Sequence, residues 1–480
     1  MNQELVISND FEQYCESIGK KYKIPGLAIG LAKNGHLVYK KEYGFRNVEE
    51  QLKVSLDTVF GIGSVTKSFT CIAIMQLQEA GKLSVHDQVT KYIPEFKTPD
   101  ANHTKQLTIE HFMTHTTGIP PLSTLYAALK RSLELEPVIG KKNTETAEEV
   151  NEEQLTKTQY IDTYEELIKT ISNAKYELLG PPGKEFSYSN DCYALLGFII
   201  ERVSGLSYES YIKQNILDPI GMKNSVFTLD EIKHYKDISY LYDSRFENNE
   251  TTVFESNNPI DAPSMRSAGF LKSTINDMLK YTEIFRNNGK VGEVSILTRK
   301  SVEDMMTPFI ECDNGGYYGY GLMIIPNFFG YKLIEHGGSI KGVAAQMHII
   351  PELGLTGVGI ANLAGVPTTK LLYSMFNEFV GQSIGDSHKK FVEINLTNEE
   401  LLEYEGDFQS GEGVRIKIHT ENDNLYFTTD GLPVTPLKSM GFDSFLLNMR
   451  ETDFIVTFIR NEQNKIHRLS FGFRQIQKVG

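Results

Sequence analysis

Apolar and polar positions along the 480-residue chain alternate with two different periods, which predict both helices and strands. Segment 10–22 has the pattern of a helix. The alternating segments on either side of Asn34-Gly35 predict two strands, because Asn-Gly between apolar alternations is a strong hairpin signal. The stretch that follows Ser64 is apolar around its whole circumference, so we expect a buried helix that ends at Gly81.

The later part of the chain repeats this combination of helix and strand. The segment YALLGFIIERVSG predicts a helix that ends at Gly205, and TTKLLYSMFNEFV predicts another. Three adjacent strands are predicted in GYYGYGLMI, YKLIEHGGSIKGVAAQMHIIP and LTGVGIANL. Strands near both ends, with helices between them, indicate an α+β fold: an α/β sandwich whose antiparallel sheet is flanked by helices.

The pattern changes near residue 390, where we place a boundary between a unit of residues 1–390 and one of residues 391–480. After Leu401 the chain consists of short alternating segments separated by turns such as ENDN and NEQN, which predicts a small antiparallel β-barrel. The acidic segment 142–159 is expected to be a solvated excursion or helical insertion at the edge of the pocket, where it would disfavour anionic substrates.

Composition and charge narrow the choice of partners. The chain has 62 acidic and 48 basic residues and a formal net charge of -14, which argues against nucleic acid or an anionic membrane as the main partner. No basic and apolar leader and no run of 18 apolar residues is visible, so a cytoplasmic location is expected, although a secreted form without its signal would have the same sequence. The four cysteines form no C-x-x-C pair, which argues against a disulfide framework or a cysteine zinc site.

Candidate chemistry begins with Ser64 and Lys67, which are three residues apart at the start of the predicted buried helix and can face the same side. A helix N-terminus offers free backbone N–H groups and the positive end of the helix dipole, both of which favour a developing oxyanion. A capping serine beside a solvated lysine has the same sequence pattern, so this pair alone does not establish a catalytic site.

Two further motifs accompany this pair. Tyr188 and Asn190 are two residues apart before a helix, so in an extended loop their side chains point to the same side. His336, Gly337 and Gly338 begin a predicted strand, where two glycines are costly unless another group approaches the backbone closely. A core tyrosine with a capping asparagine, or a bulge with a satisfied histidine, would explain each motif separately.

The three motifs in this order resemble the serine β-lactamase and penicillin-binding protein superfamily. The variant with Tyr-x-Asn as second motif is that of class C β-lactamases, D-aminopeptidases, DD-peptidases and related serine esterases. The resemblance spans residues 20 to 380 and includes IPGLAIGLAKNG, FGIGSVTKSFT, LTIEHFMTHTTGIP, PPGKEFSYSN and SAGFLKSTINDMLKY. The C-terminal segment is similar to the lipocalin-like barrel that some members carry.

The resemblance implies a serine hydrolase that cleaves an amide or ester through an acyl-enzyme. Ser64 would be the nucleophile, with either Lys67 or Tyr188 as its base, and Asn190 would orient Lys67 and the substrate amide. The N–H groups of Ser64 and of Ser339, which follows Gly338, would form the oxyanion hole. His336 would line the pocket and titrate near neutral pH.

One departure from the family pattern affects the expected substrate. The third motif is His-Gly-Gly and not Lys-Thr-Gly, which weakens the case for efficient β-lactam hydrolysis. A peptidase, D-amino-acid amidase or carboxypeptidase-like enzyme is therefore favoured over a carboxylesterase or weak β-lactamase. A non-catalytic acylation sensor or binding protein is the alternative of a different class. The barrel suits a small apolar ligand, a shaping role at the active-site mouth, or homo-oligomer formation.

Two other patterns give weaker evidence of function. Gly381 to Gly385 match G-x-S-x-G, but a helical pattern precedes Ser383 where a nucleophile elbow needs a strand. His111 and His115 are four residues apart but lack the glutamate of H-E-x-x-H, so a structural role under the active-site loop is expected. No phosphate loop or dinucleotide fingerprint is found in a credible context, and we expect no cofactor and no metal.

Overall fold

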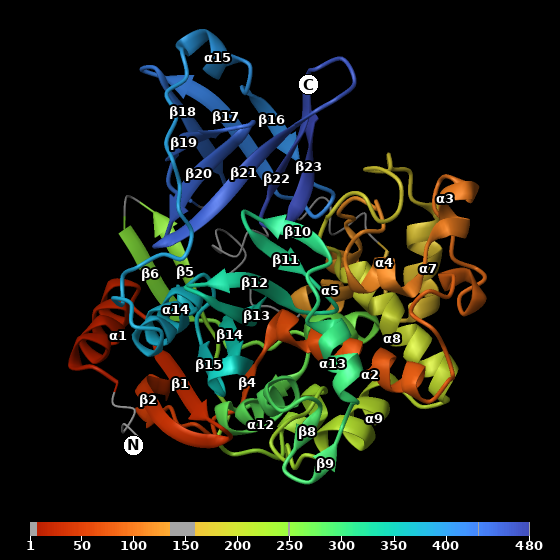
Figure 1. Cartoon of the computed structure of the whole chain (residues 1–480), viewed down its shortest axis with the longest axis vertical. Helices are drawn as coiled ribbons and strands as arrows, with labels where there is room; N and C mark the ends of the chain where they lie inside the picture. The colour runs from red at the N-terminus through yellow and green to blue at the C-terminus, as the bar shows by residue number, and fades with distance from the viewer. Residues whose placement is uncertain (1–6, 135–158, 248–249, 431, 480) are drawn as a thin grey trace.

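The computed structural model describes residues 7–134, 159–247, 250–430 and 432–479. Helices and a large sheet form the lower part of the molecule in Figure 1, and a barrel made by the last strands lies above them. The α+β class expected from the sequence is confirmed. The division at residue 390 stays a prediction, and segment 142–158 lies outside the described residues.

The large sheet has nine antiparallel strands in the order β10-β11-β12-β13-β14-β15-β1-β2-β3. N-terminal strands thus pair with strands from the second half of the chain, as the sequence predicts. Strand β1 lies between β15 and β2, and Leu27 pairs with Ala361 on one side and Tyr43 on the other. The strands are β1 (Gly26–Lys33), β2 (His36–Asn47), β3 (Leu52–Lys53), β10 (Ile310–Asp313), β11 (Gly316–Tyr318), β12 (Met323–Phe328), β13 (Tyr331–Ile340), β14 (Val343–Ile350) and β15 (Leu355–Ala361).

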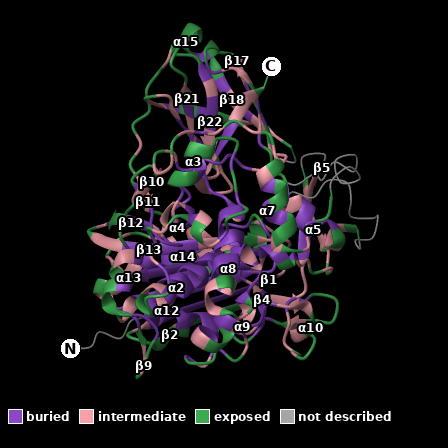
Figure 2. Cartoon of the chain, turned by 90° about the vertical axis from the view of Figure 1, so that its right-hand side faces the viewer, coloured by how far each residue is buried: buried purple, intermediate pink, exposed green. Residues whose placement is uncertain are grey.

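Helices cover both faces of this sheet. Helices α1 and α14 pack on one face, while α12 packs on the other with α2 and α8 beyond it. Buried residues are concentrated in the central strands and in α2 and α8 (Figure 2). The helices are α1 (Asn9–Lys21), α2 (Thr66–Glu79), α3 (Ala101–Gln106), α4 (Ile109–Met113), α5 (Thr124–Glu134), α7 (Tyr164–Asn173), α8 (Asn190–Ser204), α9 (Tyr208–Ile212), α10 (Leu229–Ile232), α11 (Arg266–Gly269), α12 (Ile275–Arg286), α13 (Arg299–Met305) and α14 (Thr368–Phe379).

Local sequence accounts for where several elements begin and end. Asn34 and Gly35 have φ angles of 51° and 79°, which are the values that the tight β1–β2 turn requires. Helix α8 begins after Ser189, whose hydroxyl accepts from the backbone N–H of Cys192, and it ends at Gly205 with φ 77°. Three two-stranded ribbons complete this part: β4 (Phe60–Gly61) with β7 (Lys272–Ser273), β5 (Tyr242–Glu247) with β6 (Glu250–Glu255), and β8 (Lys290–Val291) with β9 (Val294–Ser295).

The barrel closes completely, because each of its eight strands pairs with the next and the first pairs with the last. Its interior holds apolar side chains, among them Phe408, Phe427 and Phe458, so it forms a packed core. This up-and-down architecture fits the expected lipocalin-like barrel. Short helix α15 (Asn398–Leu402) precedes the strands β16 (Gly406–Gln409), β17 (Arg415–Glu421), β18 (Asn424–Thr429), β19 (Thr435–Gly441), β20 (Ser444–Met449), β21 (Thr452–Arg460), β22 (Ile466–Phe471) and β23 (Arg474–Val479).

Three predictions of strands were incomplete. The segment GYYGYGLMI contains β11 and the start of β12, separated by a turn at Gly321 with φ 68°. The segment 331–351 contains two strands, β13 and β14, joined by a turn at Gly342 with φ 66°. In the barrel, β16, β19 and β23 were not predicted. The first is short, the second contains Pro436, and the third is largely polar, so none shows a clear apolar alternation.

Candidate active site

Ser64 lies in a 3₁₀ turn (Gly63–Val65) that leads directly into the buried helix α2. Lys67 belongs to the first turn of α2 and has no exposed surface. Its Nζ is 3.1 Å from Ser64 Oγ, 2.8 Å from Asn190 Oδ1 and 2.7 Å from the carbonyl oxygen of Ala268. The two polar residues at the helix start are therefore in contact with each other.

The environment of Lys67 disfavours a charged amine. Its three hydrogen-bond partners are an amide oxygen, a carbonyl oxygen and a hydroxyl group, and none of them is a carboxylate. Burial, followed by the positive charge of Arg474, lowers the pKa of Lys67 well below its ordinary value. A neutral amine can donate two hydrogen bonds to Asn190 and Ala268 and keep its lone pair for the Ser64 hydroxyl.

Tyr188 lies over the same amine, with Lys67 Nζ 4.6 Å from the centre of its ring. Burial raises the pKa of Tyr188 above its ordinary value, while a hydrogen bond with Ser64 opposes this effect. The phenol therefore stays protonated at neutral pH. Asn190, at the first position of α8, accepts a hydrogen bond from Lys67.

The third motif lies beside the Ser64 turn, in strand β13. A Cβ atom added to Gly338 would be only 2.0 Å from the carbonyl oxygen of Ile62 and 3.1 Å from the backbone nitrogen of Ser64. On the other side of the contact, a Cβ atom added to Gly63 would be 2.7 Å from the backbone nitrogen of Ser339. Glycine thus allows the turn and the strand to touch, and it brings the N–H groups of Ser64 and Ser339 to the same contact.

His336 is 1% exposed, and its Nε2 is 3.0 Å from the hydroxyl group of Tyr318. Its Nδ1 is 2.6 Å from the carbonyl oxygen of Gly337, to which it donates. Burial lowers the pKa of His336 to about 4. The expectation that this histidine titrates near neutral pH was wrong, because the strand and Tyr318 enclose the ring.

His115 supports the loop that carries Tyr188. Its Nδ1 accepts a hydrogen bond from the backbone N–H of Ser189 at 3.0 Å. Its carbonyl oxygen accepts one from the backbone N–H of Ser187, also at 3.0 Å. Its ring centre is 4.2 Å from that of Tyr188. This confirms the structural role expected for His115, which lies beyond the end of α4 with φ 57°. Within the described ranges, no three His, Cys, Asp or Glu side chains are placed to hold a metal ion.

Ser383 has none of the surroundings of a nucleophile elbow. It lies on an exposed turn after α14, where its backbone N–H donates to Asp386 Oδ2 at 2.9 Å.

A cavity of about 1510 Å³ runs between the α/β part and the barrel and includes the motif residues. Lys67 lies beneath this cavity and is not part of its wall. Barrel residues, among them Phe473 and Arg474, form the opposite wall. The residues of the predicted site that line the cavity are Ser64, Tyr188, Asn190, His336, Gly338 and Ser339.

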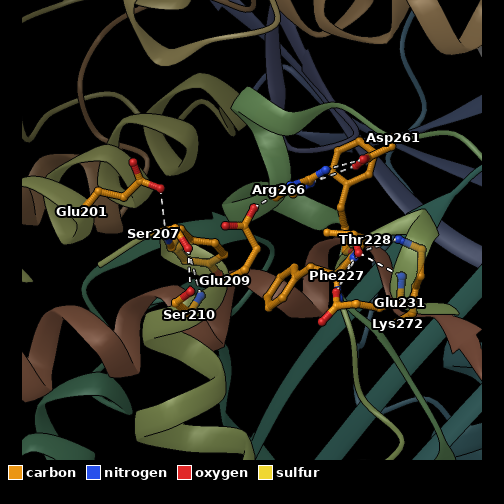
Figure 3. A network of polar contacts seen from close by, with 12 residues as sticks. Glu201, Ser207, Glu209, Ser210, Phe227, Thr228, Glu231, Asp261, Arg266 and Lys272 are labelled. Carbon is orange, nitrogen blue, oxygen red and sulfur yellow. Dashed lines mark hydrogen bonds and ion pairs between the residues drawn. The ribbon is translucent and has the colours of Figure 1, made fainter. Parts of the chain in front are cut away.

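Sequence patterns did not reveal several groups at this site. The carbonyl oxygen of Ala268 belongs to α11, which Arg266 fixes by donating to Asp261 and Glu209 (Figure 3). Tyr318 comes from β11, the second strand from one edge of the sheet, and Arg474 and Glu412 come from the barrel. Ala268 lies in SAGFLKSTINDMLKY, a segment that contributes to the family resemblance, but nothing in that segment indicates the carbonyl contact.

Several known proteins are similar to this chain in sequence or in structure. A protein from Staphylococcus aureus (strain MW2), "Protein flp", is 31% identical over 235 residues, which cover 48% of this chain and 41% of that protein. The chain thus spans less than half the length of this curated relative. In the described part of the chain no helix is long and apolar enough to cross a membrane.

Solved structures share most or nearly all of the fold. The octameric penicillin-binding protein homologue from Pyrococcus abyssi is 29% identical, with a TM-score of 0.67 over 97% of this chain and 99% of that one. A D-stereospecific amidohydrolase from a Streptomyces species is 20% identical, with a TM-score of 0.59 over 77% of this chain and 99% of its own, a likeness that shows the fold alone. The family model named Beta-lactamase matches residues 11–374, which is most of the chain. The chain therefore belongs to the Beta-lactamase family of serine hydrolases.

Proposed function

We propose that the protein hydrolyses an amide or ester bond through an acyl-enzyme on Ser64, with Lys67 as the general base. The observation that carries this proposal is the buried contact of 3.1 Å between Lys67 Nζ and Ser64 Oγ. A serine hydroxyl is a weak nucleophile and needs a base within hydrogen-bond reach. Lys67 is better suited than Tyr188, because burial favours the neutral amine of lysine, which is a base, and the neutral phenol of tyrosine, which is not.

In the first half of the proposed reaction, Ser64 Oγ bonds to the substrate carbonyl carbon as its proton passes to Lys67. The carbonyl electron pair moves to the oxygen, where the N–H groups of Ser64 and Ser339 would stabilise it, each worth roughly 10²–10³ in rate. The carbon–nitrogen or carbon–oxygen bond then breaks, and the leaving group takes a proton from the Tyr188 phenol. Lys67 passes the proton that it received from Ser64 to Tyr188 and is neutral again. In the second half, water takes the place of Ser64 as nucleophile: it gives a proton to Lys67, bonds to the acyl carbon, and Ser64 leaves with a proton.

The size of the cavity favours a peptide over a small ester. Its volume of about 1510 Å³ exceeds the roughly 300–1,000 Å³ of pockets that hold a drug-sized ligand. We therefore propose a short peptide or a D-amino-acid amide as substrate, and the Streptomyces neighbour is the reason to include D-residues. The carboxylesterase and the weak β-lactamase remain alternatives for the same acyl-enzyme chemistry.

Steady-state turnover tests the proposal. Wild-type protein, Ser64→Ala and Ser383→Ala are incubated with a p-nitrophenyl ester, a β-lactam, and L- and D-aminoacyl p-nitroanilides and dipeptides. We expect turnover by the wild type and by the Ser383→Ala control, and none by Ser64→Ala. Equal turnover by Ser64→Ala would refute the proposal, and single acylation without release would support the sensor instead.

We further propose that the chain forms a homo-oligomer through its barrel. Phe442 is fully exposed, and Val392 and Ile394 are 76% and 44% exposed. Ile394 lies next to β19, where its N–H donates to the carbonyl oxygen of Ser439. Sedimentation equilibrium of the wild type and Phe442→Ser tests this. We expect the wild type to form an assembly and Phe442→Ser to weaken it. A monomeric wild type would contradict the proposal.

A further inference from the structure

The turn between β22 and β23 inserts from the barrel into the cavity. Gly472 and Phe473 both have left-handed φ angles, of 55° and 69°, so the turn is tight. The carbonyl oxygen of Phe473 accepts from the backbone N–H of Tyr188 at 2.8 Å, and its ring meets the ring of Phe186 edge to face. The turn is therefore held directly against the loop that carries Tyr188.

Two buried side chains of the barrel fasten this contact. Gln475 is 5% exposed and its Nε2 donates to Glu185 Oε2 at 2.7 Å and to the carbonyl oxygen of Phe186 at 3.3 Å. Arg468 donates from Nη1 to the carbonyl oxygen of Leu179 at 3.0 Å. Because these bonds are buried and join two parts of the molecule, the position of the β22–β23 turn relative to the site is well defined.

Arg474 follows this turn, and its guanidinium lines the cavity. The guanidinium carbon is 5.2 Å from the centre of the Tyr188 ring. Its Nε pairs with the carboxylate of Glu412, from the loop between β16 and β17, and its Nη1 donates to the carbonyl oxygen of Gly472 at 3.2 Å. The side chains of Arg474 and Glu412 are 24% and 11% exposed, so this ion pair is partly shielded from solvent and its field reaches the neighbouring site.

Charged and titratable groups surround Lys67 on several elements, and their effects differ in sign. Arg474 lowers the pKa of Lys67, and Glu412 opposes it more weakly. Arg474 also lowers the pKa of His115 and opposes the rise in the pKa of Tyr188. The groups concerned are Cys71 of α2, Cys192 and Tyr193 of α8, Tyr188 and His115 of the adjoining loops, Tyr318 of β11, His336 of β13, and Arg474 and Glu412 of the barrel.

We propose that the barrel is part of the active site, and that Arg474 is a positioning residue whose guanidinium, held by Glu412 against the Tyr188 ring, provides the fixed positive charge that keeps Lys67 a neutral base. This inference rests on the proposed role of Lys67. It gives the barrel the shaping role at the active-site mouth that the sequence left open. The packed interior of the barrel is consistent with this role.

The protonation of Lys67 can be measured without relying on turnover. Full-length protein is labelled with [ε-¹³C]lysine, and the Lys67 resonance is identified by its loss in Lys67→Gln. Its titration midpoint is then compared in the wild type, Arg474→Gln, Arg474→Lys and Glu412→Gln. Lys272 is the internal control, since it is buried, its pKa is lowered to about 8, and its charged neighbours are Asp261, Arg266 and Glu231 (Figure 3).

We expect Arg474→Gln to raise the Lys67 midpoint by about one pH unit, the order expected for one charge within ~10 Å at an effective dielectric constant of about 20. Arg474→Lys should keep the wild-type midpoint, Glu412→Gln should lower it, and Lys272 should not move. The double variant Arg474→Gln/Glu412→Gln leaves no unpaired buried carboxylate, so it replaces Arg474→Gln in this test if Arg474→Gln fails to fold. Its Lys67 midpoint should rise by less than that of Arg474→Gln.

An unchanged Lys67 midpoint in Arg474→Gln and in the double variant would overturn the inference. A midpoint that instead moves only with Asp191→Asn would also overturn it, because Asp191 is a nearby buried carboxyl whose pKa is about 7. The pH profile of kcat/KM should lose activity on the acid side at a pH that rises with the midpoint. A higher KM with an unmoved profile would place the guanidinium on the substrate and contradict the inference.

The inference and the proposed function can fail separately. If the Lys67 midpoint shifts as expected but Ser64 accepts no acyl group, the role of Arg474 stands and the hydrolase proposal fails. If Ser64 reacts but the midpoint does not respond to Arg474, the hydrolase proposal stands and the role of Arg474 fails.

Discussion

Gly338→Ala tests most sharply whether the contact between β13 and the Ser64 turn creates the site. The new methyl group would lie 2.0 Å from the carbonyl oxygen of Ile62 and 3.1 Å from the backbone nitrogen of Ser64. An ordinary contact is longer than about 3.2 Å, so the strand and the turn must separate by roughly 1 Å. Both partners are backbone atoms, and a side-chain rotation cannot relieve the clash.

A displacement of about 1 Å at the reacting groups typically costs on the order of 10²-fold in rate, and overpacking costs about 1–3 kcal/mol of stability. We therefore expect Gly338→Ala to react with a fluorophosphonate at least about 10²-fold more slowly at Ser64, with a modest loss in the free energy of unfolding. The assay is the rate of phosphonylation by intact mass, with denaturant unfolding on the same samples.

Gly337→Ala is the matched control. Its added Cβ would lie 2.7 Å from Gln346 Oε1, which is the end of a side chain and can move. We expect this variant to keep most of the phosphonylation rate. A wild-type rate in Gly338→Ala, or equal losses in the two variants, would refute the argument that this close approach builds the site.

Three further predictions follow from buried groups around the site. Tyr318→Phe leaves His336 Nε2 without its 3.0 Å partner, so denaturant unfolding should show a loss of about 1–3 kcal/mol, and a loss no larger than that of the partly exposed Tyr92→Phe would contradict this. His115→Ala removes the acceptor of the Ser189 N–H and the ring beside Tyr188, so kcat should fall by about 10²-fold with little change in KM. An unchanged kcat would show that the loop that carries Tyr188 does not need His115 to hold it in place. Burial raises the pKa of Asp191 to about 7, so its neutral form stabilises the fold at low pH, and up to roughly 4 kcal/mol of this stability is lost as pH rises from about 4 to about 7. The free energy of unfolding of Asp191→Asn should therefore increase relative to that of the wild type between pH 5 and 8. Parallel pH dependences of the two proteins would exclude this effect.

The parts of the site that the sequence predicted are those with local causes. Ser64 and Lys67 are one helical turn apart, so helix geometry alone places them together. The β1–β2 hairpin was predicted for the same reason, because Asn34 and Gly35 determine their own turn. The resemblance to a family then brought Tyr188 and His336 into the same site, which no local rule could do.

What the sequence could not predict depends on tertiary contacts. Arg474 lies in the ordinary barrel hairpin sequence GFRQ, and nothing in that sequence indicates that the hairpin meets Tyr188, which is 286 positions earlier. The low pKa of His336 likewise depends on the burial of its ring, which cannot be read from His-Gly-Gly. A titration behaviour belongs to the folded environment and not to the residue.

The proposed division of roles between Lys67 and Tyr188 rests on the structure and not on the sequence. The sequence leaves both as candidate bases, because both types of residue serve as bases in proteins. In the structure the two groups share one buried site, and burial moves their pKa values in opposite directions. In the proposed mechanism, this one physical cause prepares the amine to accept a proton and the phenol to donate one.

The most direct test of the central claim is the identification of the residue that a fluorophosphonate modifies. Intact mass and then tandem mass spectrometry of the digested protein would be compared for the wild type, Ser64→Ala and Lys67→Gln. The account predicts a single adduct on Ser64, its absence in Ser64→Ala, and its much slower formation in Lys67→Gln. An adduct on another serine, or one that forms equally fast without Lys67, would contradict it.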